Sequence, residues 1–162
     1  MFEHLHKLLS LFRQVETISG RKKLQKIVYL LQDQGFDLEM DYSYYHYGPY
    51  SAELQAEVEE LVESGFVVEE KTSKGYEYHF TKKGSEFLRS MEEQFEFQEV
   101  CLDTTQLKLL NEQSSQFLEL VSTYAFLLKK DYKPEQSLDK TKELKPHLAE
   151  YIDNVRDFYD NL

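Results

Sequence analysis

The chain has 162 residues, of which 41% are hydrophobic and 14% aromatic, so it is expected to fold around one domain-sized core rather than stay disordered. Thirty acidic residues against nineteen basic ones give a formal net charge of −11, which opposes binding to nucleic acid unless a local basic patch compensates. A single cysteine excludes an internal disulfide framework. With no apolar run of about 20 residues and no signal-peptide pattern, the sequence predicts a cytoplasmic protein.

Helical spacing of apolar residues predicts two helices at the start of the chain, over residues 3–16 and 21–34. Ser19-Gly20 separates them, and Gly35 is expected to end the second helix. The second helix opens with cations at the end where the helix dipole does not favour positive charge. This basic cluster comprises Arg21, Lys22, Lys23 and Lys26.

A tyrosine-rich segment follows. Residues 42–47 are expected to be extended, because tyrosine fits a pleated surface. Gly48 permits a turn, and Pro49 lets the next helix begin only beyond it. Ser51 is the expected N-cap of that helix, which should end at Ser64-Gly65.

A β-hairpin is predicted next, over residues 66–71 and 76–81, with Gly75 in the connection. Thr81 is then the expected N-cap of a helix over about residues 82–97. The remaining predicted elements are helical: a short helix after residue 104, a longer one ending near residue 132, a short one around 136–144 and a last one beginning at Pro146.

This order of elements is that of a winged helix-turn-helix. The predicted fold class is therefore mainly α (α+β), with a winged helix-turn-helix-like core, a short β-hairpin wing and a C-terminal helical extension. We expect the winged-helix-like domain to span residues 1–97. The helical extension, residues 98–162, is expected to pack on it or on a second subunit.

Three segments resemble the YwgA family of Gram-positive bacteria. They are residues 20–31, which contain Lys23-Leu-Gln-Lys26, then Tyr47-Gly-Pro-Tyr-Ser51, then Leu61-Val-Glu-Ser-Gly65. The resemblance extends into Leu144-Lys-Pro-His-Leu148 and so covers most of the chain. The first part is also similar, more distantly, to the Panacea (SocA-like) antitoxin domain. The resemblance implies a helical fold with a wing, no known enzyme activity and, for Panacea-like proteins, binding and neutralisation of toxin proteins.

The helix beginning at Ser51 occupies the position of a recognition helix, but all of its charged residues are acidic. They are Glu53, Glu57, Glu59, Glu60 and Glu63. In a major groove these carboxylates would approach phosphates, at a cost on the order of 1 kcal/mol for each close approach. We expect either a solvated helix face or an acidic surface for a basic protein partner.

The basic cluster, with Lys71 and Lys74 of the wing, is the best candidate for contact with nucleic acid. Three interpretations remain open from the sequence: solvated cations balanced by nearby acids, a partner-binding patch, or contact with phosphates. A patch of this kind would position a duplex without reading its bases.

The alternation along residues 42–47 places Tyr42, Tyr44 and His46 on one side and Tyr45 and Tyr47 on the other. One set can pack under neighbouring helices while the other is partly exposed. A rigid corner of the core, a set of interface anchors and a small-molecule pocket are the alternatives.

The spacing of the histidines and of Cys101 does not suggest zinc, and the scattered glycines do not form a phosphate-binding loop. We therefore expect no catalytic, cofactor or metal site, and a non-enzymatic protein.

The predicted function is that of a protein-interaction module, antitoxin-like or adaptor-like, with an unknown and toxin-like protein partner. Its candidate interface is Tyr45, Tyr47, Tyr50, Glu53, Glu57 and Glu60. The alternative is a winged-helix DNA-binding transcriptional regulator that uses the basic helix 21–34 and the wing. Homodimerisation through the Phe- and Tyr-rich last helices is also expected.

Overall fold

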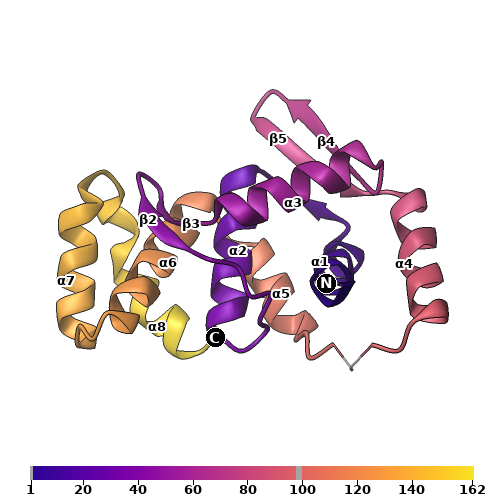
Figure 1. Cartoon of the computed structure of the whole chain (residues 1–162). Coiled ribbons are helices and arrows are strands. Elements are labelled where there is room, and N and C mark those ends of the chain that lie inside the picture. Colours follow the sequence, from indigo (N-terminus) through magenta and orange to yellow (C-terminus); the bar gives the residue numbers. More distant parts are fainter. Residues whose placement is uncertain (1, 98–99) are drawn as a thin grey trace.

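A computed structural model describes residues 2–97 and 100–162 as a mainly helical chain with two small antiparallel sheets (Figure 1). The first part of the chain forms α1 (Phe2–Val15), β1 (Thr17–Ile18), α2 (Arg21–Asp33), β2 (Ser43–Tyr45), β3 (Gly48–Tyr50), α3 (Ala52–Glu63), β4 (Val67–Thr72), β5 (Gly75–Phe80) and α4 (Lys82–Gln94). The rest forms α5 (Thr104–Asn111), α6 (Ser115–Lys129), α7 (Pro134–Leu144), the 3-10 helix η1 (Pro146–Asn154) and α8 (Val155–Asp160).

The predicted helices at the start of the chain are confirmed. Helix α2 is buried along almost its whole length, with every residue from Leu24 to Leu31 in the interior. It contacts α5 and α6 and lies in the middle of the molecule (Figure 1). One hydrophobic core runs through both predicted parts of the chain, from Leu8 in α1 to Val121 in α6. Most side chains of α2 therefore contact other elements of the protein rather than solvent.

Both predicted N-caps are confirmed. The Ser51 hydroxyl accepts a hydrogen bond from the Leu54 amide at 3.1 Å, so α3 begins where the sequence places it. The Thr81 hydroxyl accepts one from the Gly84 amide at 2.9 Å. Short polar side chains satisfy the unpaired amides of a first helical turn, which makes these boundaries readable locally.

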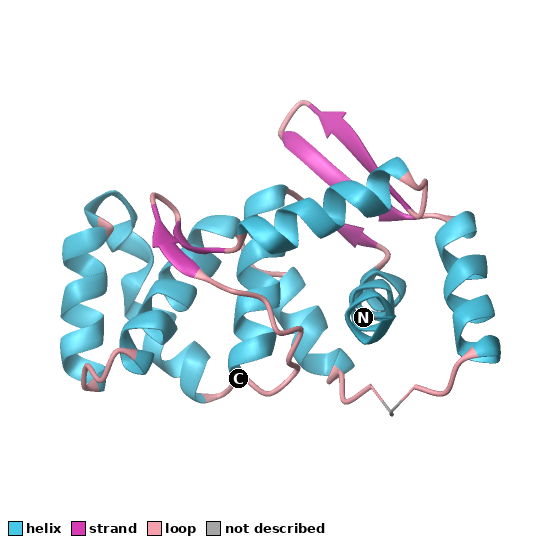
Figure 2. Cartoon of the chain, in the orientation of Figure 1, coloured by secondary structure: helices cyan, strands magenta, loops and turns pink. Residues whose placement is uncertain are grey.

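The sheet of the β4–β5 hairpin has a third strand that the sequence did not predict. Strand β1 pairs antiparallel with β5, with Ile18 opposite Tyr78, and gives the order β1-β5-β4. Two residues are too few for a periodic signal. The β4–β5 hairpin stands out from the helical body (Figure 2).

The tyrosine-rich segment differs from its prediction. The predicted turn at Gly48 and Pro49 is instead strand β3, which pairs with β2 so that Tyr45 lies opposite Gly48. The chain reverses at His46 and Tyr47. Proline is tolerated here because this sheet has two strands and both are edges.

Two helical predictions were wrong at their ends. Helix α4 ends at Gln94, before the predicted end at about residue 97, and Phe95 is 45% exposed. The last predicted helix is instead η1 followed by the short α8. The predicted domain boundary at residues 97 and 98 adjoins positions outside the described residues. Within residues 2–97 and 100–162, no helix combines the length and apolar character needed to cross a bilayer.

Candidate functional site

Two residues of α2 hold the β2–β3 hairpin in place. The Lys26 ammonium donates a hydrogen bond to the Pro49 carbonyl oxygen at 2.6 Å. The Gln25 amide donates to the Ser51 carbonyl oxygen at 2.8 Å and accepts from the Ser51 amide at 2.9 Å. The Lys-Leu-Gln-Lys stretch of α2 and the Tyr-Gly-Pro-Tyr-Ser stretch are thus two halves of one buried contact.

Gly48 allows the hairpin to approach α6 closely. Its φ is +92°, in the region that favours glycine. A Cβ at this position would lie 2.9 Å from the Thr123 hydroxyl oxygen and 3.6 Å from the Lys26 ammonium nitrogen. No side chain fits between the hairpin and α6 without a shift of one of them.

Beneath the hairpin lies a fully buried carboxylate, Glu119 of α6. It forms ion pairs with Lys22 and, at 3.1 Å, with Lys145. The Lys145 ammonium also donates to the His46 carbonyl oxygen at 2.5 Å, so it ties the start of η1 to the hairpin. Burial raises the pKa of Glu119, but its contacts with the two lysines outweigh this effect and hold the pKa below its usual value.

Lys26 is 1% exposed and lies next to this ion cluster. Burial lowers the pKa of Lys26 to about 7, because desolvation disfavours the ammonium form. Glu119 opposes the shift, while the positive charges of Lys22 and Lys145 add to it. A lysine with this pKa is only partly charged at neutral pH.

The tyrosines divide between the core and the surface as their alternation predicts. Tyr42 donates its hydroxyl to the Gln25 carbonyl oxygen at 3.0 Å, and Tyr44 is half-buried against Phe126. On the other side Tyr45 and Tyr47 are 56% and 63% exposed. The hairpin therefore offers two aromatic rings to solvent on a backbone that the buried contacts hold fixed.

Tyr47 and Tyr50 border a pocket of about 440 Å³ between α2, the hairpin and α3. We call it the tyrosine pocket; it is lined by Arg21, Lys22, Gln25, Lys26, Tyr47, Tyr50, Gln55 and Glu59. The Lys22 ammonium lies 5.0 Å from the centre of the Tyr47 ring, a cation–π contact. The Tyr45 and Tyr50 rings meet edge to face at 5.6 Å. The pocket therefore joins part of the basic cluster to the tyrosine-rich hairpin.

The basic cluster is not a single solvated patch, because its four cations have different surroundings. Lys26 is buried, and Lys23 donates to the Asn111 carbonyl oxygen at 3.1 Å. Arg21 forms an ion pair with Glu69 and lies 4.4 Å from the centre of the Tyr76 ring. The reason is tertiary: four other elements, β3, β4, α5 and α6, each supply an acceptor to the first two turns of α2.

The two lysines of the β4–β5 hairpin do not line the tyrosine pocket. Lys71 and Lys74 are both exposed on the β4–β5 hairpin. Lys71 is paired with Tyr76 across the two strands, so it shares a face with the ring that Arg21 covers.

The predicted interface is divided between two sites, because its acidic residues do not line the tyrosine pocket. Glu57 and Glu60 border a separate groove of about 290 Å³ with Phe2 and Leu5 of α1, and Glu53 is exposed. Glu57 and Glu60, three residues apart, share one face of α3. Gln55 and Glu59, four residues apart, share another face, which lines the tyrosine pocket.

Within the α1–α3 groove, one carboxylate is destabilised in its charged form. Burial raises the pKa of Glu57, with His4 opposing and the charges of Glu53 and Glu60 adding to the rise. Glu59, which is not among the predicted interface residues, borders the tyrosine pocket instead.

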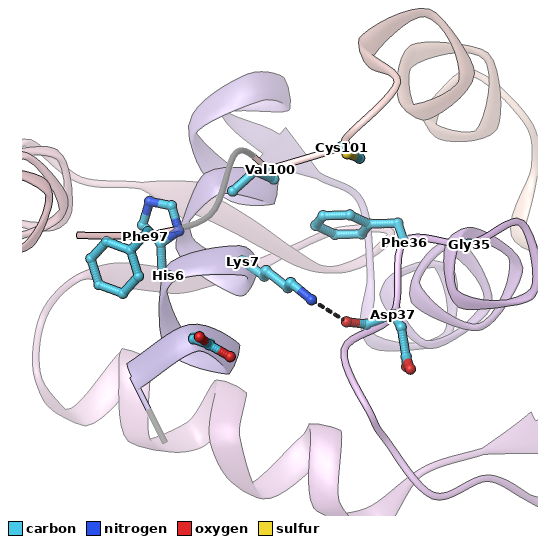
Figure 3. A pocket seen from close by; sticks show the side chains of 9 residues that line it. His6, Lys7, Gly35, Phe36, Asp37, Phe97, Val100 and Cys101 are labelled. Carbon is cyan, nitrogen blue, oxygen red and sulfur yellow. Dashed lines mark hydrogen bonds between the residues drawn. The ribbon is translucent and has the colours of Figure 1, made fainter. Parts of the chain in front are cut away.

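A third, smaller pocket of about 200 Å³ lies between α1 and the segment after α2 (Figure 3). Lys7 donates to the Asp37 carbonyl oxygen at 2.7 Å across it, and His6 stacks on Phe97 at 4.1 Å. Cys101 is at its edge (Figure 3). Among the residues that the structure describes, no group of three or more His, Cys, Asp or Glu side chains is arranged to hold a metal ion.

Sequence reasoning missed Glu119 and Lys145. Glu119 stands in the apolar stripe of α6, where an acid is unexpected, and this was the available signal. Lys145 lies in the segment Leu144-Lys-Pro-His-Leu148 that carries the family resemblance, which was a second signal.

The chain is similar to a protein of Bacillus subtilis (strain 168) that is described as uncharacterized protein YwgA. The two are 38% identical over 130 residues, which cover 78% of this chain and 75% of the relative. No family model matches the chain.

Proposed function

This chain belongs to the YwgA family, and on that premise we propose that it is a non-enzymatic protein-interaction module that binds a polypeptide partner at the tyrosine pocket. The proposal rests on the geometry of the pocket, since the relative's description assigns no activity.

The observation that carries the proposal is the exposure of Tyr47 on a fixed hairpin. A tyrosine that is 63% exposed leaves a large apolar ring in water. The backbone beside it is held by Lys26 and Gln25, so binding would order little that is not already ordered. Rigid aromatic side chains at the edge of a pocket are the usual anchors of protein interfaces.

The order of elements supports a winged-helix arrangement. Helices α1, α2 and α3 come before the β4–β5 hairpin in the chain. This hairpin takes the wing position and belongs to the sheet of order β1-β5-β4. In such an arrangement α3 is the recognition helix. Here α3 carries five glutamates and no cation, and the β2–β3 hairpin stands directly before its N-terminus. These features favour a polypeptide over a duplex.

The more distant similarity to the Panacea (SocA-like) domain favours an antitoxin-like or adaptor-like role. We infer that the module acts by occluding its partner or by recruiting it to a third protein. Neither action requires a catalytic group at the pocket.

The alternative is a winged-helix DNA-binding regulator, and the sheet order with exposed Lys71 and Lys74 is the observation that favours it. Against it, Arg21 already pairs with Glu69, and Lys23 already donates to the Asn111 carbonyl oxygen. A shift assay on random genomic fragments separates the two functions. Tight binding that weakens steeply with salt supports the regulator, and no binding at low salt removes it.

The proposal is tested by affinity purification from the native host with three forms of the full chain. The wild type is expected to retain a protein partner that Tyr47→Ala loses. Tyr132→Ala, which removes another exposed tyrosine outside the pocket, is expected to retain it. Equal recovery by Tyr47→Ala and the wild type, or recovery of only a second copy of the protein, would contradict the proposal.

A further inference from the structure

The tyrosine pocket adjoins a cluster in which three lysines share one carboxylate. Three lysine side chains, Lys22, Lys26 and Lys145, converge on one buried carboxylate, Glu119. The charged form of a buried lysine is costly without a counter-charge, and this cost lowers the pKa of Lys26. This excess occurs in a protein whose overall charge is −11.

Two of these three lysines line the pocket. Lys22 and Lys26 both border it, while Lys145 approaches from the start of η1 behind the hairpin. Of the other charged groups at the pocket, Arg21 is already paired with Glu69. Glu59 is exposed at the rim, within 3.2 Å of the Gln55 amide nitrogen. The pocket is thus lined by two lysines that Glu69 does not engage and by two tyrosines, Tyr47 and Tyr50.

We propose that the tyrosine pocket receives a carboxylate of the partner polypeptide, held between Lys22 and Lys26, with the apolar part of the same residue against Tyr47 and Tyr50. This inference rests on the proposed function and names the chemical group that the pocket recognises. The carboxylate supplies the counter-charge that the lysine cluster lacks.

A carboxylate fits this pocket better than a phosphate does. Phosphate recognition relies on arginine forks or several donors at once. The one arginine that lines the pocket is engaged by Glu69, and Lys26 already donates to the Pro49 carbonyl oxygen. The donors that remain at the pocket match the single negative charge of a carboxylate.

Binding of a carboxylate has a measurable consequence at Lys26. In the unbound protein burial holds the pKa of this lysine near 7, and a nearby anion favours the ammonium form. Occupation of the pocket therefore raises the pKa of Lys26.

The test is a pH titration of the lysine side-chain signals of the full-length protein by NMR. The probes are N-acetyl-phenylalanine, its carboxamide, N-acetyl-glutamic acid α-amide and inorganic phosphate. A free carboxylate is expected to move the Lys26 midpoint upward by about one pH unit or more, which corresponds to roughly tenfold tighter binding to the charged form. The neutral carboxamide is expected to leave it unchanged.

The probes also identify the source of the carboxylate. A response to N-acetyl-phenylalanine alone assigns the terminal carboxylate of a polypeptide, and a response to the glutamic acid amide alone assigns an acidic side chain. No shift with either carboxylate, or an equal shift with phosphate, would overturn the inference. In that case a Tyr47-dependent partner in the purification experiment would still support the proposed function, so the two failures are distinguishable.

Lys26→Met is expected to weaken binding of the responding carboxylate at least tenfold. Lys82→Met is the control, because the Lys82 side chain is 91% exposed on α4 and outside the pocket. Equal loss in both variants would point to nonspecific charge attraction and overturn the inference.

Discussion

The buried ammonium of Lys26 lies 2.6 Å from the carbonyl oxygen of Pro49, and this contact joins the middle of α2 to the hairpin that carries the exposed tyrosines. It joins the Lys-Leu-Gln-Lys stretch of α2 to the Tyr-Gly-Pro-Tyr-Ser stretch of the hairpin. A hydrogen bond from a buried cation is worth more than a neutral one, provided that the cation keeps a partner. The position of the tyrosine pocket therefore depends on residues that do not touch solvent.

Replacement of Gly48 is predicted to displace the hairpin. Gly48→Ala adds a Cβ 2.9 Å from the Thr123 hydroxyl at a φ of +92°, so both overpacking and backbone strain oppose it. We expect a loss of about 2–4 kcal/mol in the free energy of unfolding, measured by urea denaturation. Gly75→Ala is the matched control, with a φ of +126° but no atom within 4 Å. A Gly48→Ala loss no larger than that of Gly75→Ala would show that the close approach to α6 is unimportant.

The low pKa of Lys26 predicts a pH-dependent stability. Between about pH 7 and its ordinary value of 10.5, the unfolded protein holds a proton at this lysine that the folded protein does not. The free energy of unfolding of the wild type should therefore rise with pH across this window, relative to that of Lys26→Met. The rise should be on the order of a few kcal/mol in full.

The comparison is best made between pH 7 and 9. Above this range tyrosines begin to ionise, and burial raises the pKa of Tyr29 and Tyr42, which adds an opposite dependence. A constant difference between the wild type and Lys26→Met from pH 7 to 9 would mean that Lys26 stays charged in the folded protein.

Removal of the buried carboxylate of Glu119 is predicted to lower the stability of the protein more than removal of an exposed carboxylate does. Glu119→Gln leaves Lys22 and Lys145 without their counter-charge inside the protein. Breaking one partner of a buried ion pair costs about 3–5 kcal/mol. Glu63→Gln, an exposed change at the end of α3, is expected to alter stability by less than about 0.5 kcal/mol. Similar values for the two variants would exclude an organising role for Glu119.

The parts of this fold that are local could be predicted from the sequence. The helices over residues 2–15 and 21–33 follow from one apolar stripe each, and Ser51 and Thr81 mark helix starts because their caps are made within three residues. The hairpin of β4 and β5 follows from alternation and a glycine.

The parts that depend on distant partners could not be predicted in the same way. Strand β1 exists only because β5, which lies far along the sequence and pairs Tyr78 with Ile18, offers it an edge. From the sequence Lys26 is expected to be a surface cation, and only the tertiary fold places Glu119 and Pro49 near it. Glu57 and Glu59 of α3 border different pockets, because other elements lie on two sides of the helix. Side-chain type and spacing do not encode which surfaces meet.

The central claim is that a polypeptide docks at the tyrosine pocket, and site-specific photo-crosslinking in cells of the native host tests it most directly. A benzophenone-bearing phenylalanine analogue in place of Tyr47 is expected to crosslink to one protein partner, and the same analogue in place of Tyr132 is expected not to. Crosslinking to that partner from position 132 but not from position 47, or to nucleic acid from position 47, would contradict the claim.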